Sequence, residues 1–363
     1  MPAASTPNDR ESDKIPPRGT SSPVYTEEEK NKITQYIRDL QNDLIREFLS
    51  SHGLVKGGKK DELCDRVEWA ISHGIINYSD LVSYLDGIAP NSKQHVIVYD
   101  GPSDEILQAW RDPEIAKTKL KEQQLIDQVD NSLPLILPVD LKISLVEYTP
   151  GRELKITAVE RRDYKLRLEK KDFSEEDGGR TIEYKAYTPE VDRGIFIFTW
   201  NLVTNKADLR IAQLPKRSSY EVAEERFGRL LQPALNLGAF PKHDIRRSIN
   251  KLQELAEKGN VVARPNGLKY LSAGGRQVDI KGPTNKDSVL GERSIDKSII
   301  NIRKHGMGHI GNFYWQPSGK IKRISDKEIH FVIIGKKSRV NFRKPTKKEI
   351  VDYVISRLRE YSS

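Results

Sequence analysis

The period of the hydrophobic pattern changes near residue 90, and this change limits the folds that the chain can adopt. Before it, apolar residues in the segment 26–52 recur every three or four positions, as on one face of an α-helix. After it, short segments of alternating apolar and polar residues follow one another, as at 94–100, 141–160 and 193–214. The last two are predicted to be hairpins, with turns at Pro150-Gly151 and Thr204-Asn205-Lys206. We therefore predict an α+β multidomain chain with N-terminal helices and an antiparallel, β-rich middle domain.

Composition and turn signals divide the chain into five parts. Residues 1–25 are rich in Pro, Ser and charged residues and are predicted to form a disordered tail. A helical domain at 26–90 and the β-rich domain at 91–215 follow it. We then predict a helical unit with a hairpin at 216–283, and a basic hairpin with a C-terminal helix at 284–363.

The unit at 216–283 is compatible with a winged-helix fold, because two amphipathic helical patterns precede a short hairpin. The hairpin is predicted to turn at Pro265-Asn266-Gly267. In a winged helix the second helical pattern would enter DNA, with Arg246 and Arg247 on its exposed face. The alternative is a helix–hairpin unit that serves only for packing.

Positive charge is concentrated in the C-terminal third of the chain. The whole sequence has a formal net charge of +9. Residues 241–363 hold 27 Lys and Arg against 12 Asp and Glu, a net charge of +15, whereas the first 240 residues have a net charge of −6. Such an asymmetry indicates contact with a polyanion, most simply nucleic acid, and the alternative is a solvated basic surface.

The densest basic stretch lies at 327–361, where a hairpin is predicted to turn at Gly335-Lys336-Lys337-Ser338. A helix capped by Thr346 follows, with Ile350, Val354 and Leu358 among its inward-facing residues. We predict that cations at one end of this unit form a phosphate-binding site. They are Lys336, Lys337, Arg339, Arg343, Lys344, Lys347 and Lys348.

A second basic motif lies in the segment LIREFLSSHGLVKGGKKDELCDR, at 44–66. One helical pattern ends at Gly53 and the next begins near Lys59. Gly57 and Gly58 would let the backbone approach a phosphate, and the free amides at the start of the second helix favour an anion. Lys56, Lys59 and Lys60 add positive charge; the alternative is a solvated turn between two packed helices.

This segment resembles the SAP domain, a helix, extended loop, helix module that binds DNA. The resemblance covers about residues 40–75 and rests on the spacing of apolar, glycine and basic positions together. They are Leu44, Phe48, Leu49, Gly53, Leu54, Gly58, Lys59, Lys60, Glu62, Leu63, Arg66 and Val67. Cys64 stands where the family usually has an aliphatic residue. The resemblance implies DNA binding through Lys56, Gly57, Gly58, Lys59, Lys60 and Arg66.

Motifs that suggest catalysis are weak. Asp140, Glu153 and Lys155 imitate the P-x-D…E-x-K site of metal-dependent nucleases. However, the predicted hairpin places the two carboxylates about 26 Å apart, at about 3.3 Å per residue, unless a bulge or another pairing brings them together. The motif GMGHIG at 306–311 imitates a dinucleotide fingerprint, but a helical pattern precedes it and we predict a loop.

Other residues with possible chemistry have structural alternatives. Cys64, the single cysteine, lies on the apolar face of its helix and is predicted to be a core residue. Phe313, Tyr314 and Trp315 could stack on unpaired bases, or pack in the core. We expect no metal ion and no cofactor.

These patterns favour a non-catalytic DNA-binding protein that contacts the phosphate backbone of double-stranded DNA with weak sequence preference. The alternatives are a metal-dependent nuclease, and a scaffold whose β-rich domain binds a protein partner. No apolar run approaches the roughly 20 residues of a membrane span and no signal peptide is evident, so we expect an intracellular protein of the nucleoid or nucleus.

Overall fold

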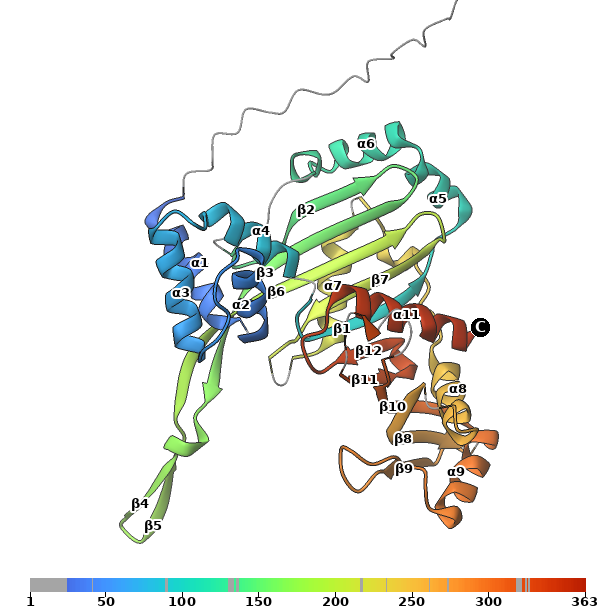
Figure 1. The fold of residues 1–363 in the computed structure, drawn as a ribbon. Coiled ribbons are helices and arrows are strands. Elements are labelled where there is room, and N and C mark those ends of the chain that lie inside the picture. The colour runs from blue at the N-terminus through green and yellow to red at the C-terminus, as the bar shows by residue number, and fades with distance from the viewer. Residues whose placement is uncertain are drawn as a thin grey trace, which may run out of the picture. The chain divides into compact units, whose positions relative to one another are not determined.

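The computed structural model describes residues 25–363, apart from 41, 89–90, 130–133, 135–136, 216–217, 233, 261, 273, 318–321, 324 and 326 (Figure 1). The predicted tail at 1–25 lies outside these residues, except for its last position. The chain divides into two compact units, Met1–Leu85 and Asp86–Ser363. Each unit is described by itself.

Helices form the N-terminal unit: α1 (Glu27–Asp39), α2 (Asn42–Ser51), α3 (Lys60–Ser72) and α4 (Tyr78–Ile88), the last of which crosses the boundary. Thr26 caps α1 as a capping box, because its hydroxyl accepts the Glu29 amide at 3.2 Å and the Glu29 carboxylate accepts the Thr26 amide at 2.8 Å. The apolar pattern that suggested one long helix is divided, since α1 ends at Asp39 and its C-cap, Leu40, is extended. Cys64 is buried among the apolar residues of this unit, as predicted.

An antiparallel sheet dominates the C-terminal unit, which confirms the α+β prediction. Within the described residues, its ten strands are in the order β2-β3-β6-β7-β1-β12-β11-β10-β8-β9, and a separate ribbon pairs β4 with β5. The strands are β1 (Gln94–Asp100), β2 (Lys142–Thr149), β3 (Glu153–Arg167), β4 (Phe173–Asp177), β5 (Arg180–Tyr184), β6 (Tyr187–Asn201), β7 (Lys206–Ala212), β8 (Ala263–Ser272), β9 (Gln277–Lys281), β10 (Gly306–Trp315), β11 (Ile329–Ile334) and β12 (Arg339–Phe342).

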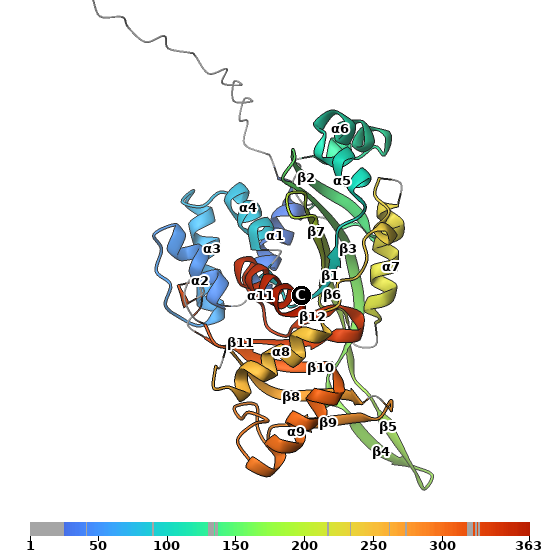
Figure 2. The ribbon, with the colours of Figure 1, turned by 90° about the vertical axis from the view of Figure 1, so that its right-hand side faces the viewer.

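Helices cover the two faces of this sheet. They are α5 (Asp104–Arg111), α6 (Pro113–Glu122), α7 (Tyr220–Leu231), α8 (Arg246–Glu257), α9 (Arg293–His305) and α11 (Lys348–Ser362). Short 3-10 turns lie at Ile126–Gln128, Glu169–Lys171, Leu237–Ala239 and Gly335–Lys337. In Figure 2, α7 lies on one side of the strands and α11 on the other.

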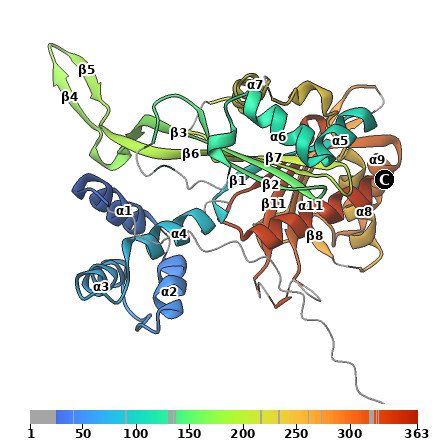
Figure 3. The same cartoon turned by 90° about the horizontal axis from the view of Figure 1, so that it is seen from above.

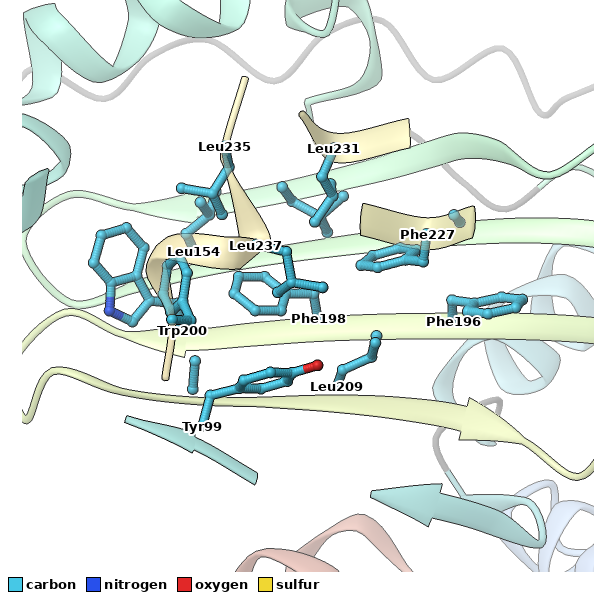
Figure 4. Packing of buried hydrophobic residues seen from close by; sticks show 14 of the residues in the cluster. Tyr99, Leu154, Phe196, Phe198, Trp200, Leu209, Phe227, Leu231, Leu235 and Leu237 are labelled. Atoms are coloured by element: carbon cyan, nitrogen blue, oxygen red, sulfur yellow. The ribbon is translucent and has the colours of Figure 1, made fainter. Parts of the chain in front are cut away.

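Two hydrophobic clusters meet at strand β1. Val96 and Val98 belong to the cluster formed with α8, α9 and α11, and Ile97 and Tyr99 belong to the cluster formed with α5, α6 and α7. Because successive side chains of a strand point to opposite faces, the clusters lie on opposite sides of the sheet at β1. Figure 4 shows the second cluster, where the side chains of α7 and the following turn meet those of β3, β6, β7 and β1.

Strand β1 also joins segments that are far apart in the sequence. Gln94 pairs with Ala212 on one side and with Phe342 on the other. The predicted parts 91–215, 216–283 and 284–363 thus all contribute strands to one sheet and lie in one compact unit.

The predicted turn at Pro265-Asn266-Gly267 is wrong, because β8 runs through these residues. Gly267 pairs with Asn312 and Pro265 with Phe313, so Asn266 takes up a shift in the register with β10. A bulge of this kind tolerates proline within a strand. The side-chain Nδ2 of Asn266 donates to the carbonyl oxygens of Thr284 and Asp287, at 2.7 and 2.9 Å. The chain turns toward β9 only beyond residue 272.

The predicted loop at 306–311 is also wrong, because these glycine-rich residues form the first part of β10. A Cβ atom at Gly308 would lie 2.7 Å from the Cβ of Ile249 in α8, and one at Gly335 would lie 2.7 Å from the Cγ of Arg246. The glycines therefore let α8 pack close to the sheet. A helix precedes the motif and a strand occupies it, which is not the strand–turn–helix order of a dinucleotide site.

Candidate nucleic-acid interface

The loop between α2 and α3 has the helix, extended loop, helix arrangement that the sequence predicts. Gly53 ends α2 with φ of +69°, and the Leu54 amide donates back to the carbonyl oxygen of Leu49 at 2.9 Å. Residues 54–57 carry no helix or strand, and α3 begins at Lys60.

Two arginines hold this loop in place. Nη1 of Arg66, on α3, donates to the carbonyl oxygens of Val55 and Gly57 at 2.7 and 2.9 Å. Nη2 of Arg46, on α2, donates to the carbonyl oxygen of Gly58 at 3.1 Å. Arg66, which we predicted as a DNA contact, therefore uses its guanidinium to fix the shape of the loop.

Three lysines project from the loop that the arginines hold. Lys56, Lys59 and Lys60 are exposed, and no carboxylate of the described residues pairs with their ammonium groups. Carbonyl oxygens of the loop are held by hydrogen bonds. The backbone positions from which these lysines extend are therefore limited. The loop thus presents three free cations from a constrained backbone.

The start of α3 differs from the predicted anion site, because a carboxylate already lies there. Oε2 of Glu62 accepts the Lys59 amide at 3.3 Å. Gly58 has φ of +120°, and a Cβ atom there would lie 2.4 Å from Oε2 of Glu62, so this position suits glycine. An anion at the loop would accordingly be attracted by the lysine side chains more than by the helix dipole.

The basic hairpin of the C-terminal unit forms as predicted, with Ser338 in the left-handed conformation at φ of +48°. Its cations do not gather at one end, however. Lys336 and Lys337 precede β12 and Arg343 and Lys344 follow it, so four strand residues, about 13 Å, separate the two pairs. α11 starts at Lys348, whose amide donates to Oδ1 of Asn91 at 2.9 Å, rather than at a cap by Thr346.

Some of these cations are already neutralised within the unit. Lys337 and Arg339 both pair with Glu221 at the start of α7, and Arg339 is only 8% exposed. Lys348 pairs with Asp352 at 2.8 Å, and Lys347 is half-buried. Lys336, Arg343 and Lys344 are exposed, and no ion pair engages them in the part of the chain that the structure describes.

Burial and the positive charge around Arg343 lower the pKa of two histidines. The pKa of His330 is lowered to about 4, chiefly by burial and in addition by the nearby Arg343, Lys344 and Arg264. The pKa of His95 is likewise lowered to about 3, chiefly by burial and in addition by Arg339 and Arg343. Both imidazoles are therefore neutral at pH 7, and His330 Nε2 donates to Oδ1 of Asn312 at 2.7 Å.

Tyr314 is not available to stack on a base. The Arg264 guanidinium lies over its ring at 4.4 Å, and His330 stacks on it with ring centroids 4.4 Å apart. Phe313 and Trp315 are fully buried, so the packing alternative is confirmed for them.

Helix α8, the recognition helix of the winged-helix hypothesis, packs against both α11 and β10. Ser248 and Gln253 are fully buried, and the Ser248 hydroxyl donates to the carbonyl oxygen of Leu358 at 2.6 Å. Arg246 pairs with Asp244 at 2.5 Å, and Arg247 is exposed in the first turn. Because α11 and β10 cover two faces of α8, no side of this helix is free along its length to enter a DNA groove.

The structure does not bring the nuclease candidates together. Glu153 pairs with Thr149 at the turn of the β2–β3 hairpin, and the Lys155 ammonium pairs with Glu147. Asp140 precedes β2 near the other end, where the Arg161 amide donates to the carbonyl oxygen of Pro138. A register shift lies between Ile143 and Leu145, but eight residues of β3, about 26 Å, still separate the two ends. Among the described residues, no three His, Cys, Asp or Glu side chains form a group that could hold a metal ion.

One constellation that the sequence did not suggest joins Ser362, His243 and Asp100. Nδ1 of His243 lies 2.9 Å from Oδ1 of Asp100, and its Nε2 lies 2.8 Å from Oγ of Ser362. These distances resemble a hydrolytic triad, but Ser362 is only 7% exposed and its hydroxyl also lies 2.9 Å from the carbonyl oxygens of Leu358 and Arg359. Nη2 of Arg359 donates to the carbonyl oxygens of Tyr99 and Ala207, so this group anchors the end of α11 to the sheet.

A β-arm extends from the sheet and was not predicted. β3 and β6 pair with each other through Arg167 and Tyr187, far beyond the ends of their other partners, and the β4–β5 ribbon continues the arm (Figures 1 and 3). Phe173, Ile182 and Tyr184 lie on one face of that ribbon, and their exposed fractions are 59, 36 and 40%. Residues 173–184 carry a net charge of −3. An acidic ribbon with an apolar face is typical of a contact with protein rather than DNA.

Comparison with known proteins adds no family to these observations, since no family model and no curated protein matches the chain. None of the described helices has the length and apolar character needed to cross a membrane.

Proposed function

We propose that this protein binds double-stranded DNA through the phosphate backbone, with the loop at 54–60 as one contact. The observation that carries the proposal is a set of three exposed, unpaired lysines, Lys56, Lys59 and Lys60, on a loop held by Arg46 and Arg66. The resemblance of this segment to the SAP domain supports it. Binding to DNA would place the protein in the nucleoid or nucleus.

The second contact in this proposal is the group of free cations in the C-terminal unit, Lys336, Arg343 and Lys344. The net charge of +15 over residues 241–363 supports it. Each contact is weak by itself, because a few solvated cations release few counterions when they bind phosphate. Such contacts also carry little sequence specificity. Two contacts on one chain raise each other's effective concentration, and affinity follows without base reading at either site.

The experiment is a titration of the full chain with a labelled DNA duplex, followed by fluorescence anisotropy over a series of salt concentrations. Changing Lys59 and Lys60 together to Ala removes two phosphate contacts, which lowers the slope of log affinity against log salt by about 1.8. The matched control changes Lys117 and Lys121 on α6 to Ala, with the same loss of charge and an unchanged slope. Equal slopes for the loop variant and the wild type would refute the proposed contact.

A further inference from the structure

We propose that α9 enters the major groove of duplex DNA and reads base edges, which gives the protein a sequence preference that the lysine loop cannot provide. This inference rests on the proposed DNA binding. It concerns Arg293, Lys297, Asn301 and Lys304, which follow one another at intervals of four, four and three residues. That spacing places all four on one face of the helix.

The four side chains are free to contact a ligand. All of them are exposed. The hydrogen bonds and ion pairs of α9 within the described residues involve other side chains, namely Ser294, Asp296, Ser298 and Arg303. Asp296, the one acid of this helix, accepts the Gly291 amide at 3.0 Å, at the start of α9. The exposed face therefore presents three cations and a carboxamide with no carboxylate among them.

The opposite face of α9 fixes its orientation. Ile299 is buried in the cluster formed with α8 and α11, and Ile302 packs against the same cluster. Nη2 of Arg303 pairs with Oε2 of Glu257 in α8 at 2.7 Å. α9 lies in the lower part of the unit in Figures 1 and 2, near β8 and β9. A helix anchored on one side and free on the other can be inserted into a groove without unfolding.

The dimensions and chemistry of this face fit the major groove. The 13 residues of α9 span about 20 Å, and a groove about 12 Å wide admits an α-helix. Arginine can donate two hydrogen bonds to guanine, and asparagine can both donate to and accept from adenine. Arg293 and Asn301 are separated by about 12 Å along the axis, about three to four base pairs. Lys297 lies between these two residues and Lys304 lies beyond Asn301 on the same face, where a long side chain can reach a phosphate or the acceptor atoms of guanine.

A flanking cation strengthens this assignment. Ser272, at the end of β8, pairs with Gly306, the residue that follows α9. The β8–β9 turn therefore lies beside the C-terminal end of α9, and its Arg276 is exposed. Two other helices lack such a face: α3 carries Asp61, Glu62, Asp65 and Glu68, and on α11 Lys348 and Arg357 are ion-paired.

The test is selection of binding sites from a random duplex library with the full chain. We expect the wild type to enrich one motif that contains a G·C and an A·T position about three to four base pairs apart. Asn301→Ala relaxes the A·T position and Arg293→Ala relaxes the G·C position, each by about 5- to 150-fold in discrimination. Both residues are exposed, so circular dichroism and thermal unfolding of the variants should match the wild type.

The lysine-loop variant separates this inference from the proposed function. Changing Lys59 and Lys60 to Ala lowers the affinity for every sequence and leaves the motif unchanged. Duplex binding by the wild type with no enriched motif, or with a motif that both α9 variants retain, overturns the role of α9 alone. Absence of duplex binding at low salt overturns both the inference and the proposed function.

Discussion

Replacing Arg66 with Ala separates a residue that positions the loop from one that contacts DNA. The change removes two hydrogen bonds from Nη1, to Val55 and Gly57 at 2.7 and 2.9 Å. A hydrogen bond to a charged group contributes about 1.5 to 3 kcal/mol, but these loop carbonyls regain water when the side chain is lost. We therefore expect local opening of the loop to become easier by about 1 to 2 kcal/mol in total.

Hydrogen exchange measures this opening directly. A change of 1 to 2 kcal/mol raises the exchange rate of the amides at 54–60 by about 5- to 30-fold. DNA affinity falls because the lysines are less well placed, but the salt slope stays constant, since Lys56, Lys59 and Lys60 still neutralise their phosphates. Arg66→Lys is the matched control, because it keeps the charge but cannot reach two carbonyls in the same geometry. A slope lowered by about 0.9 with unchanged loop exchange would refute the reasoning and make Arg66 a phosphate contact.

Two further predictions concern the C-terminal unit. Burial raises the pKa of Glu221, but hydrogen bonds from Lys337 and Ser219 and the charge of Arg339 outweigh it and hold the pKa at about 2. Because the folded pKa is depressed, this carboxylate stabilises the fold above its unfolded pKa near 4.5, and the stabilisation is lost as pH falls toward 2. Glu221→Gln should flatten the loss of stability between those pH values in urea unfolding, and a curve parallel to the wild type would contradict it. On the arm, Phe173→Ser with Tyr184→Ser should leave duplex affinity unchanged, because residues 173–184 carry a net charge of −3 and repel phosphate. A photocrosslinker at Ile182 should yield protein adducts in cells that the double variant loses, whereas DNA adducts would argue against a protein contact.

Local patterns predicted those parts of the fold whose signals lie close together in the sequence. The β2–β3 hairpin was predicted because alternating residues flank Pro150-Gly151, and β6 and β7 meet at Thr204-Asn205 for the same reason. The first part of β10 was predicted to be a loop, because a glycine-rich segment considered without its neighbours in space is typical of a loop. The role of these glycines depends on Ile249, 59 positions from Gly308, and on the close packing of α8. The arm was missed because its length reflects where β2 and β7 stop pairing, which no residue of β3 or β6 encodes by itself.

The sequence by itself determined the periods of the helices and strands, the charge asymmetry, and the glycine–lysine loop between α2 and α3. Each of these depends on neighbouring residues, whose conformational preferences and charges act over a few positions. Only the tertiary structure decided which cations are free, because an ion pair depends on distance in space. Arg339 pairs with Glu221, which lies 118 positions away in the sequence. The Arg66 guanidinium donates to carbonyl oxygens of the loop. Arg293 and Lys297 on α9 remain exposed.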